Sequence, residues 1–206
     1  MENYADLMFH DAVTELQKQD GSFDKYQAAY GHRTLEKLRP EEIGFLKSRE
    51  SFYIASVTPE GWPYVQHRGG AQGFIKVVGP NRIACADYRG NRQFITMGNL
   101  TDNARVSLFF MDYMNKARMK VQGLASLVGL EDADPELRAQ VVEPGTRAER
   151  LLVVDIVALD WNCPQYIPRL YSEDAIRQVV GGQMAALEAE NAALKQELAQ
   201  LKGASG

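Results

Sequence analysis

The sequence has few of the residues that build metal centres and disulfide frameworks. Its 206 residues include three histidines and two cysteines, and the cysteines, Cys85 and Cys163, lie far apart without metal-ligand spacing. This pattern predicts two reduced thiols and no metal site. The sequence also lacks the His-Glu-x-x-His, Gly-x-Ser-x-Gly, Walker and Gly-x-Gly-x-x-Gly motifs. It therefore gives no sign of a zinc protease, a nucleophile elbow or a glycine-rich nucleotide loop.

Long apolar runs and an excess of positive charge are missing as well. No stretch approaches the roughly 20 apolar residues that span a bilayer, and the polar, acidic residues 1–20 do not have the pattern of a secretory signal. The net charge is −4, from 23 basic and 27 acidic residues, which argues against a general basic surface for nucleic acid. We therefore expect a cytoplasmic protein without a nucleic-acid or membrane partner. A net charge of −4 still allows a local anion-binding site made of a few arginines.

What the sequence does contain is a series of short segments rich in β-forming residues. Turns such as Pro59-Glu60-Gly61 and Pro80-Asn81 separate them. The segments cover 52–58, 63–68, 74–78, 82–88, 106–112, 118–128 and 151–159. Because no helix between them is long enough for repeated parallel crossovers, we predict a mainly β fold, with an antiparallel sheet or barrel.

Flanking helices are predicted from turn and capping residues. A helix near residues 9–20 should end at Gly21, and further helices should open at Pro40 and Asp134. A short helix is expected over 92–100.

The C-terminal segment repeats apolar side chains at alternating spacings of three and four, which is the heptad pattern of a coiled coil. The a positions hold Met184, Asn191 and Leu198, and the d positions hold Leu187, Leu194 and Leu201. An asparagine at an a position favours two strands in one register. The pattern predicts a parallel homodimeric coil, and the alternative is a single amphipathic helix packed on its own domain.

The charges beside this seam fit the parallel arrangement. Glu190 and Glu197 fall at g positions, and Lys195 and Lys202 fall at the e positions five residues further on. In a parallel dimer each glutamate therefore faces a lysine of the other strand. Because the seam spans barely three heptads, we expect it to reinforce a dimer that is made elsewhere.

Arginines and glycines gather where predicted strands end. His67-Arg68-Gly69-Gly70 closes one strand, and residues 87–93 join another strand to the helix over 92–100. Asn91 is a predicted N-cap, which would place Arg92 and Gln93 in the first helical turn. Free N–H groups at a helix start suit a phosphate, and a nearby arginine adds a bidentate clamp.

A later strand adds two more cations, because Arg118 and Lys120 stand two positions apart and hence on one face. Together with Arg68 and Arg92 they could converge on one dianion. The alternative for each arginine is a solvated surface charge, and for Gly69, Gly70 and Gly90 it is ordinary turn chemistry.

At these residues the sequence resembles the pyridoxamine 5′-phosphate oxidase-like family of FMN-binding split β-barrels. The matching stretches are FYIASVTPEGWPYVQHRGG, ACADYRGNRQFITMGNL, RVSLFFMDYMNKARMKVQG and DWNCPQYIPR. The resemblance implies a six-stranded Greek-key barrel and a homodimer with two FMN sites at its interface. Together with the helices predicted at both ends, we expect three domains: an N-terminal helical extension over 1–39, the FMN-binding barrel over 40–172, and a C-terminal helix or parallel coiled coil over 173–206.

Carried over to this sequence, the phosphate ligands would be Arg68, Asn91 and Arg92. Arg118 stands where the family has a glutamine that reaches the flavin. The candidate set also holds the backbone of 67–70 (His67 to Gly70) beside the isoalloxazine ring, and Trp161, which could close over the ring from the opposite subunit. Asp87 and Gln93 lie in the same matched stretch and complete the set.

Two departures from the family argue against pyridoxamine phosphate oxidation. Ile167-Pro168-Arg169-Leu170 stands where the oxidase has an Arg-Leu-Ala-Pro-type motif that contributes to its substrate site, and the segment 69–71 replaces a lysine of the oxidase. We therefore expect an FMN-dependent oxidoreductase acting on an unidentified small molecule. The alternative is a non-catalytic sensor or carrier that binds flavin, deazaflavin or haem.

Cys163 could meet the flavin or substrate, or it could be a small buried filler.

Overall fold

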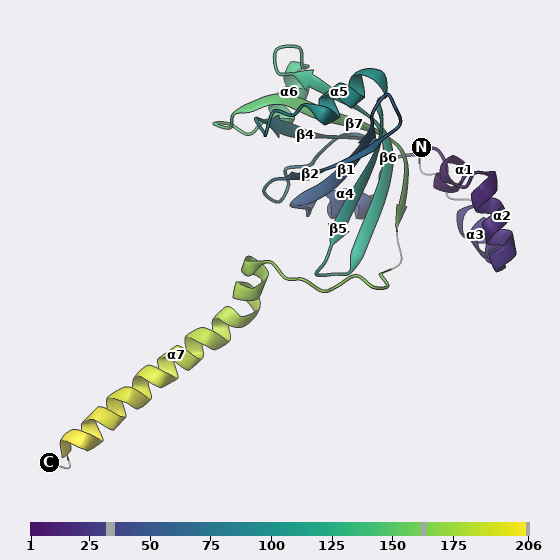
Figure 1. The fold of residues 1–206 in the computed structure, drawn as a ribbon. Coiled ribbons are helices and arrows are strands. Elements are labelled where there is room, and N and C mark those ends of the chain that lie inside the picture. Colours follow the sequence, from purple (N-terminus) through teal and green to yellow (C-terminus); the bar gives the residue numbers. More distant parts are fainter. Residues whose placement is uncertain (32–35, 162–163, 205–206) are drawn as a thin grey trace. The chain divides into compact units, whose positions relative to one another are not determined.

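The computed structural model describes residues 1–31, 36–161 and 164–204 of the chain. Its main body is a seven-stranded antiparallel sheet (Figure 1). The strands are β1 (Ser51–Val57), β2 (Pro63–Gly69), β3 (Lys76–Gly79), β4 (Arg82–Tyr88), β5 (Arg105–Asp112), β6 (Ala117–Gly129) and β7 (Ala148–Trp161). Each of the seven predicted β segments overlaps one of these strands, so the predicted antiparallel, mainly β fold is confirmed.

The strand order is β2-β1-β5-β6-β7-β4-β3, which leaves β2 and β3 at the two edges. No pairing joins β2 to β3 in the described part of the chain, so backbone hydrogen bonds do not close the sheet into a barrel. The sheet also has seven strands where the family resemblance implied six. The short β3 accounts for one of them, since it pairs with β4 as a hairpin with an irregular register between Val77 and Gly79.

The core forms because alternate residues of each strand point to the same face. On β5, Val106, Leu108 and Phe110 are at most 4% exposed, whereas the residues between them are partly exposed. Phe52 of β1 packs against Phe110 with the two rings tilted and 5.2 Å between ring centres. Each such buried side chain contributes about 1.5–3 kcal/mol through removal of apolar surface from water.

The long pair β6–β7 has an irregular register at Gly123, and this glycine is required by packing. A Cβ at Gly123 would lie 2.7 Å from a methyl of Val154 and 2.8 Å from the carbonyl oxygen of Asp155. Only hydrogen fits there, so the two strands approach each other closely at this point.

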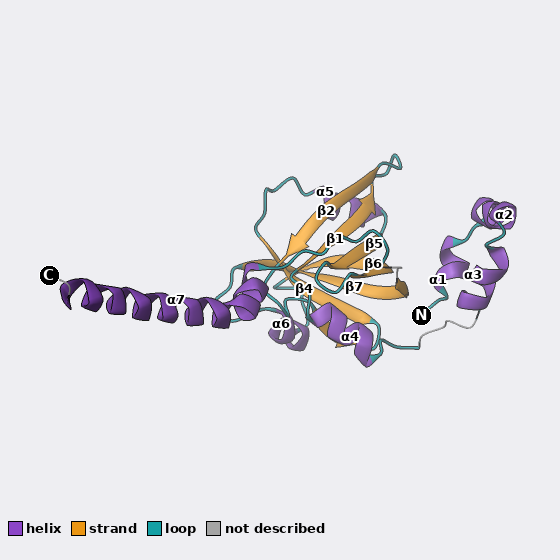
Figure 2. Ribbon diagram, turned by 90° about the horizontal axis from the view of Figure 1, so that it is seen from below, coloured by secondary structure: helices purple, strands orange, loops and turns teal. Residues whose placement is uncertain are grey.

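Three helices lie against the sheet. They are α4 (Pro40–Lys47), α5 (Ile95–Asp102) and α6 (Pro135–Val141). α4 contacts β3, and α6 contacts β3 and β4 (Figure 2). As predicted, α4 begins at Pro40 and α6 is capped by Asp134, whose carboxylate accepts from the backbone N–H groups of Glu136 and Leu137.

The N-terminal region forms α1 (Tyr4–Met8), α2 (Asp11–Asp20) and α3 (Phe23–Tyr30). The predicted end of the helix at Gly21 is confirmed, because this glycine adopts a left-handed conformation with φ of 77°. Two contacts tie the region to β7. The Glu2 backbone N–H donates to the Val157 carbonyl at 2.7 Å, and the Tyr30 hydroxyl donates to Asp160 at 2.7 Å.

The chain divides into two compact units, residues 1–112 with 116–165, and residues 113–115 with 166–206. The second unit is dominated by the 32-residue helix α7 (Glu173–Ala204). Four side chains of the predicted seam, Met184, Leu187, Leu194 and Leu198, are 53–60% exposed along it. The side chain of Leu201 lies outside the described part. None of the described helices is both long and apolar enough to cross a membrane.

Candidate functional site

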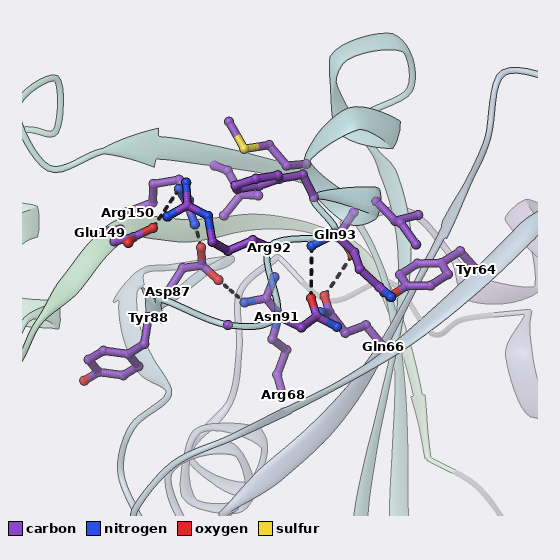
Figure 3. Close-up of a pocket in the computed structure, with 16 residues that line it drawn as sticks. Tyr64, Gln66, Arg68, Asp87, Tyr88, Asn91, Arg92, Gln93, Glu149 and Arg150 are labelled. Atoms are coloured by element: carbon purple, nitrogen blue, oxygen red, sulfur yellow. Dashed lines mark hydrogen bonds and ion pairs between the residues drawn. The ribbon is translucent and has the colours of Figure 1, made fainter.

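A pocket opens where β2, β4 and β7 meet the loop that precedes α5 (Figure 3). Its polar lining consists of Tyr64, Gln66, Arg68, Asp87, Tyr88, Asn91, Arg92, Gln93, Thr96, Glu149 and Arg150. The cavity measures about 70 Å³. This is space for about five water-sized atoms, which is the size of a phosphate group and much less than a three-ring flavin.

Strand alternation decides which residues of β2 reach the pocket. Tyr64, Gln66 and Arg68 line it, whereas His67 between them points to the other face of the sheet. There the His67 ring contacts Tyr53 edge-on, with 5.6 Å between ring centres. The structure thus places Arg68 in the pocket and His67 outside it.

Asp87 binds two of the arginines that line the pocket. It lies at the end of β4, is 4% exposed, and forms ion pairs with two arginines. One carboxylate oxygen accepts from the Arg68 guanidinium, and the other accepts from Nε of Arg150 at 2.8 Å (Figure 3). A single buried carboxylate therefore fixes the direction of two guanidinium groups.

The loop before α5 differs from the prediction. Asn91 is not the N-cap, because α5 begins at Ile95 and Phe94 is its capping residue. Arg92 and Phe94 have φ of 62° and 58°, a left-handed conformation that interrupts a right-handed helix. The Asn91 side chain instead accepts from the backbone N–H of Gln93 at 3.1 Å, which closes a local turn.

Arg92 and Gln93 consequently line the pocket from a loop, not from a helical turn. The Arg92 guanidinium lies 5.6 Å from the ring centre of Phe94, and that of Arg150 lies 6.0 Å from the same centre. Contacts of this length are favourable cation–π interactions. One aromatic ring thus neighbours two of the pocket's three guanidinium groups.

Five predicted site residues lie outside this pocket, namely His67, Gly69, Gly70, Arg118 and Trp161. Gly70 has a packing role, because a Cβ there would lie 2.7–3.0 Å from three carbons of the Phe74 side chain. A Cβ at Gly69 would meet the His67 ring at 3.1 Å. Arg118 lies on β6, and its Nε is buried with no hydrogen-bond partner among the described residues.

Trp161 is engaged within its own chain. Its indole N–H donates to a carboxylate oxygen of Glu42 at 3.1 Å, and its ring packs edge-on against Phe45 at 4.7 Å. Glu42 is fully buried. Burial raises the pKa of Glu42, but hydrogen bonds from Arg39 and Trp161 outweigh this effect and hold the pKa below its ordinary value.

The structure does not bring four cations together, so that prediction is wrong. Lys120 pairs with Asp160 at 3.2 Å and lies 4.7 Å from the ring centre of Tyr4. Arg68 and Arg92 do meet in one pocket, and the third cation there is Arg150. Sequence reasoning missed Arg150 because the last strand was predicted to begin at Leu151, just after Arg150, whereas it begins at Ala148. It missed Gln66 because the amide of this side chain carries no charge.

The cysteines and the possible metal ligands are the last residues to place. Burial raises the pKa of the Cys85 thiol to about 12, and Cys163 lies outside the described residues. Within the described ranges no group of three or more histidine, cysteine, aspartate or glutamate side chains has the arrangement of a metal site.

Comparison with known proteins identifies related chains. A family model described as "Pyridoxamine 5′-phosphate oxidase" matches residues 38–160. No curated protein sequence matches the chain.

Similar solved structures include a pyridoxamine 5′-phosphate oxidase candidate from Lactobacillus delbrueckii, with 16% identity, 62% and 97% of the two chains covered and a TM-score of 0.49. HupZ of Group A Streptococcus has 12% identity, 65% and 100% coverage and a TM-score of 0.46. The heme storage protein HutZ of Vibrio cholerae has 19% identity, 60% and 94% coverage and a TM-score of 0.43. Scores this low carry no argument about ligand or activity.

Proposed function

The chain belongs to the pyridoxamine 5′-phosphate oxidase family, and from this premise we propose that it binds FMN. The phosphate of FMN would occupy the pocket around Arg68 and Arg92. The observation that carries this proposal is the meeting of these two arginines, predicted from separate segments of the sequence, in a cavity of phosphate size.

Two features of the pocket support a fit to a phosphate. Guanidinium groups bind phosphate oxygens through short, charge-assisted hydrogen bonds. The Nε of Arg68 is buried and has no hydrogen-bond partner in the described part of the chain, which is unfavourable unless a ligand accepts from this guanidinium group. Asn91 and Gln93 border the same cavity with amide groups that can donate to the remaining oxygens.

The ring system of FMN needs more room than this cavity offers. We propose that the ring extends past the pocket toward the backbone of 67–70 and Arg118, and that a second copy of the chain completes the site. Like the Nε of Arg68, the Nε of Arg118 is buried and has no hydrogen-bond partner in the part of the chain that the structure describes, which supports a ligand near it. Trp161 of the second copy stays a proposed contact of the ring.

The proposed homodimer is also supported by α7. Its seam side chains are half exposed or more, and the glutamates and lysines beside the seam complement each other in a parallel pair. We propose the division into an extension (1–39), a flavin-binding domain (40–172) and a coiled-coil helix (173–206).

The proposed reaction is an oxidation or reduction of a small molecule. FMN, when bound, supplies the electron transfer, while the protein's residues bind the phosphate, orient the ring and exclude water. The second candidate is a flavin-, deazaflavin- or haem-binding module without turnover. A histidine beside the ring could serve as the proton donor of a flavin reaction. The second candidate is favoured because the His67 ring points away from the pocket toward Tyr53.

The absorption spectrum of the purified protein tests the ligand, because flavin, deazaflavin and haem have distinct spectra. The double variant Arg68→Ala/Arg92→Ala should lose FMN, since each lost charge-assisted hydrogen bond weakens binding by about 1.5–3 kcal/mol. Arg82→Ala is the matched control, because Arg82 forms an exposed ion pair with Asp155. Unchanged flavin content in the double variant, with an intact dimer, would contradict the proposal.

Turnover is tested by mixing the FMN-loaded protein anaerobically with NADH or NADPH and following flavin bleaching. Bleaching supports the oxidoreductase. A flavin that stays oxidised with both donors, and with a panel of amines, supports the non-catalytic module.

A further inference from the structure

We infer that Arg150 is a third ligand of the bound phosphate and that Asp87 is the positioning residue that directs it. The inference rests on the proposed binding of FMN and adds a residue that none of the matched motifs contains. Arg150 belongs to β7, which pairs with β4 so that Arg150 stands directly opposite Asp87.

The geometry around Asp87 holds two guanidinium groups at one site. Arg68 comes from β2 and Arg150 from β7, and each binds a different oxygen of the Asp87 carboxylate. Figure 3 shows the carboxylate between them, with Arg68 on one side and Arg150 on the other. The side chains of Arg68 and Arg150 are 18% and 19% exposed, so both groups are confined and retain little freedom to lose on binding.

The charge of the pocket depends on Arg150. The lining contains three arginines, Arg68, Arg92 and Arg150, against two acids, Asp87 and Glu149. Without Arg150 the charges would balance and the pocket would not favour an anion. With it the lining has an excess of one positive charge, which is the sign that a phosphate requires.

The guanidinium group of Arg150 also has N–H donors that are not used by the described part of the chain. Its Nε binds Asp87 at 2.8 Å and its Nη1 binds Glu149 at 3.2 Å. Within the described ranges the structure records no hydrogen-bond partner for its Nη2, and a guanidinium carries five N–H donors in total. The guanidinium groups of Arg92 and Arg150 lie 5.6 and 6.0 Å from the same ring centre, that of Phe94, and both residues line the same pocket.

The test compares the affinities of FMN and riboflavin, which share the ring and differ in the phosphate. Dissociation constants are measured by flavin fluorescence for the full-length protein and for Arg150→Ala and Arg150→Met, the second of which keeps an apolar stem of similar length. We expect each variant to bind FMN about tenfold or more weakly while riboflavin binds as before. Arg82→Ala, in the same strand pair but at an exposed ion pair, should change neither affinity.

Asp87→Asn tests the positioning role through the same ratio. Removing a negative charge would by itself strengthen phosphate binding, whereas loss of orientation weakens it. We expect the preference for FMN over riboflavin to fall, and a rise would overturn the role of Asp87.

The outcomes separate this inference from the proposed function. A wild-type protein that binds neither flavin refutes FMN binding itself. A wild-type protein that prefers FMN, together with Arg150 variants that keep the full preference while Arg68→Ala loses it, refutes the inference and leaves the proposed function standing. Loss of the preference in either folded Arg150 variant, with riboflavin binding intact, supports it.

Discussion

Replacing Trp161 by phenylalanine tests how this side chain is used within its own chain. The substitution keeps an aromatic ring against Phe45 and removes the indole N–H that donates to the buried carboxylate of Glu42. A hydrogen bond to a charged group contributes about 1.5–3 kcal/mol. For a protein of this size that corresponds to a fall in melting temperature of about 3–12 °C.

The pH dependence of the free energy of unfolding gives a second test of the role of Trp161. The pKa of Glu42 lies below its ordinary value of 4.5, so its contribution to the free energy of unfolding is fully present above 4.5 and is lost as the pH falls through the folded-state pKa. Trp161→Phe removes a donor and raises that pKa. The stability difference between wild type and variant should therefore be largest at neutral pH and shrink in acid.

Urea denaturation at neutral pH and at a pH below the folded-state pKa of Glu42 measures both effects. Trp62→Phe is the matched control, because the chain's other tryptophan is 74% exposed on the hairpin between β1 and β2. A loss of stability that is equal for both tryptophans, or that does not shrink in acid, would refute the assigned role of Trp161.

Three further predictions follow from the packing and the tail. Gly70→Ala should destabilise the fold by about 1–3 kcal/mol, measured by urea denaturation, because its Cβ would overlap the Phe74 side chain; unchanged stability would show that the loop is freer than described. Deleting the residues after Gly182 should weaken the dimer in analytical ultracentrifugation without emptying the pocket of flavin, and complete conversion to monomer would show that α7 alone makes the dimer. Cys85, buried and with its pKa raised to about 12, should resist alkylation in the native protein and react once urea unfolds it, as followed by mass spectrometry of the Cys85 peptide.

The sheet could be predicted from the sequence because its strands obey a local rule. Alternating burial, as on β5 with Val106, Leu108 and Phe110 inside, leaves a pattern that can be read from one strand alone. The start of α5 could not be predicted in the same way. Asn91 has the side chain of an N-cap, but left-handed backbone at Arg92 and Phe94 delays the helix to Ile95, and neither residue type signals that conformation.

The candidate site likewise contains residues that were predicted from the sequence and one that was not. Arg68 and Arg92 were predicted to meet because both stand beside strand ends with glycines, and the structure places both in one pocket. Arg150 reaches that pocket through the pairing of β4 with β7, which joins Asp87 to a residue far along the chain. The sequence around Asp87 does not show that β4 will pair with β7, because these two strands are far apart along the chain.

A crystal structure of the protein grown with FMN tests the central claim most directly. The account predicts a phosphate within hydrogen-bond distance of the guanidinium groups of Arg68 and Arg92, with the ring system between two copies of the chain. A phosphate bound elsewhere, or bound flavin beside an Arg68 that stays paired only with Asp87 and an Arg92 that contacts no phosphate oxygen, would contradict it.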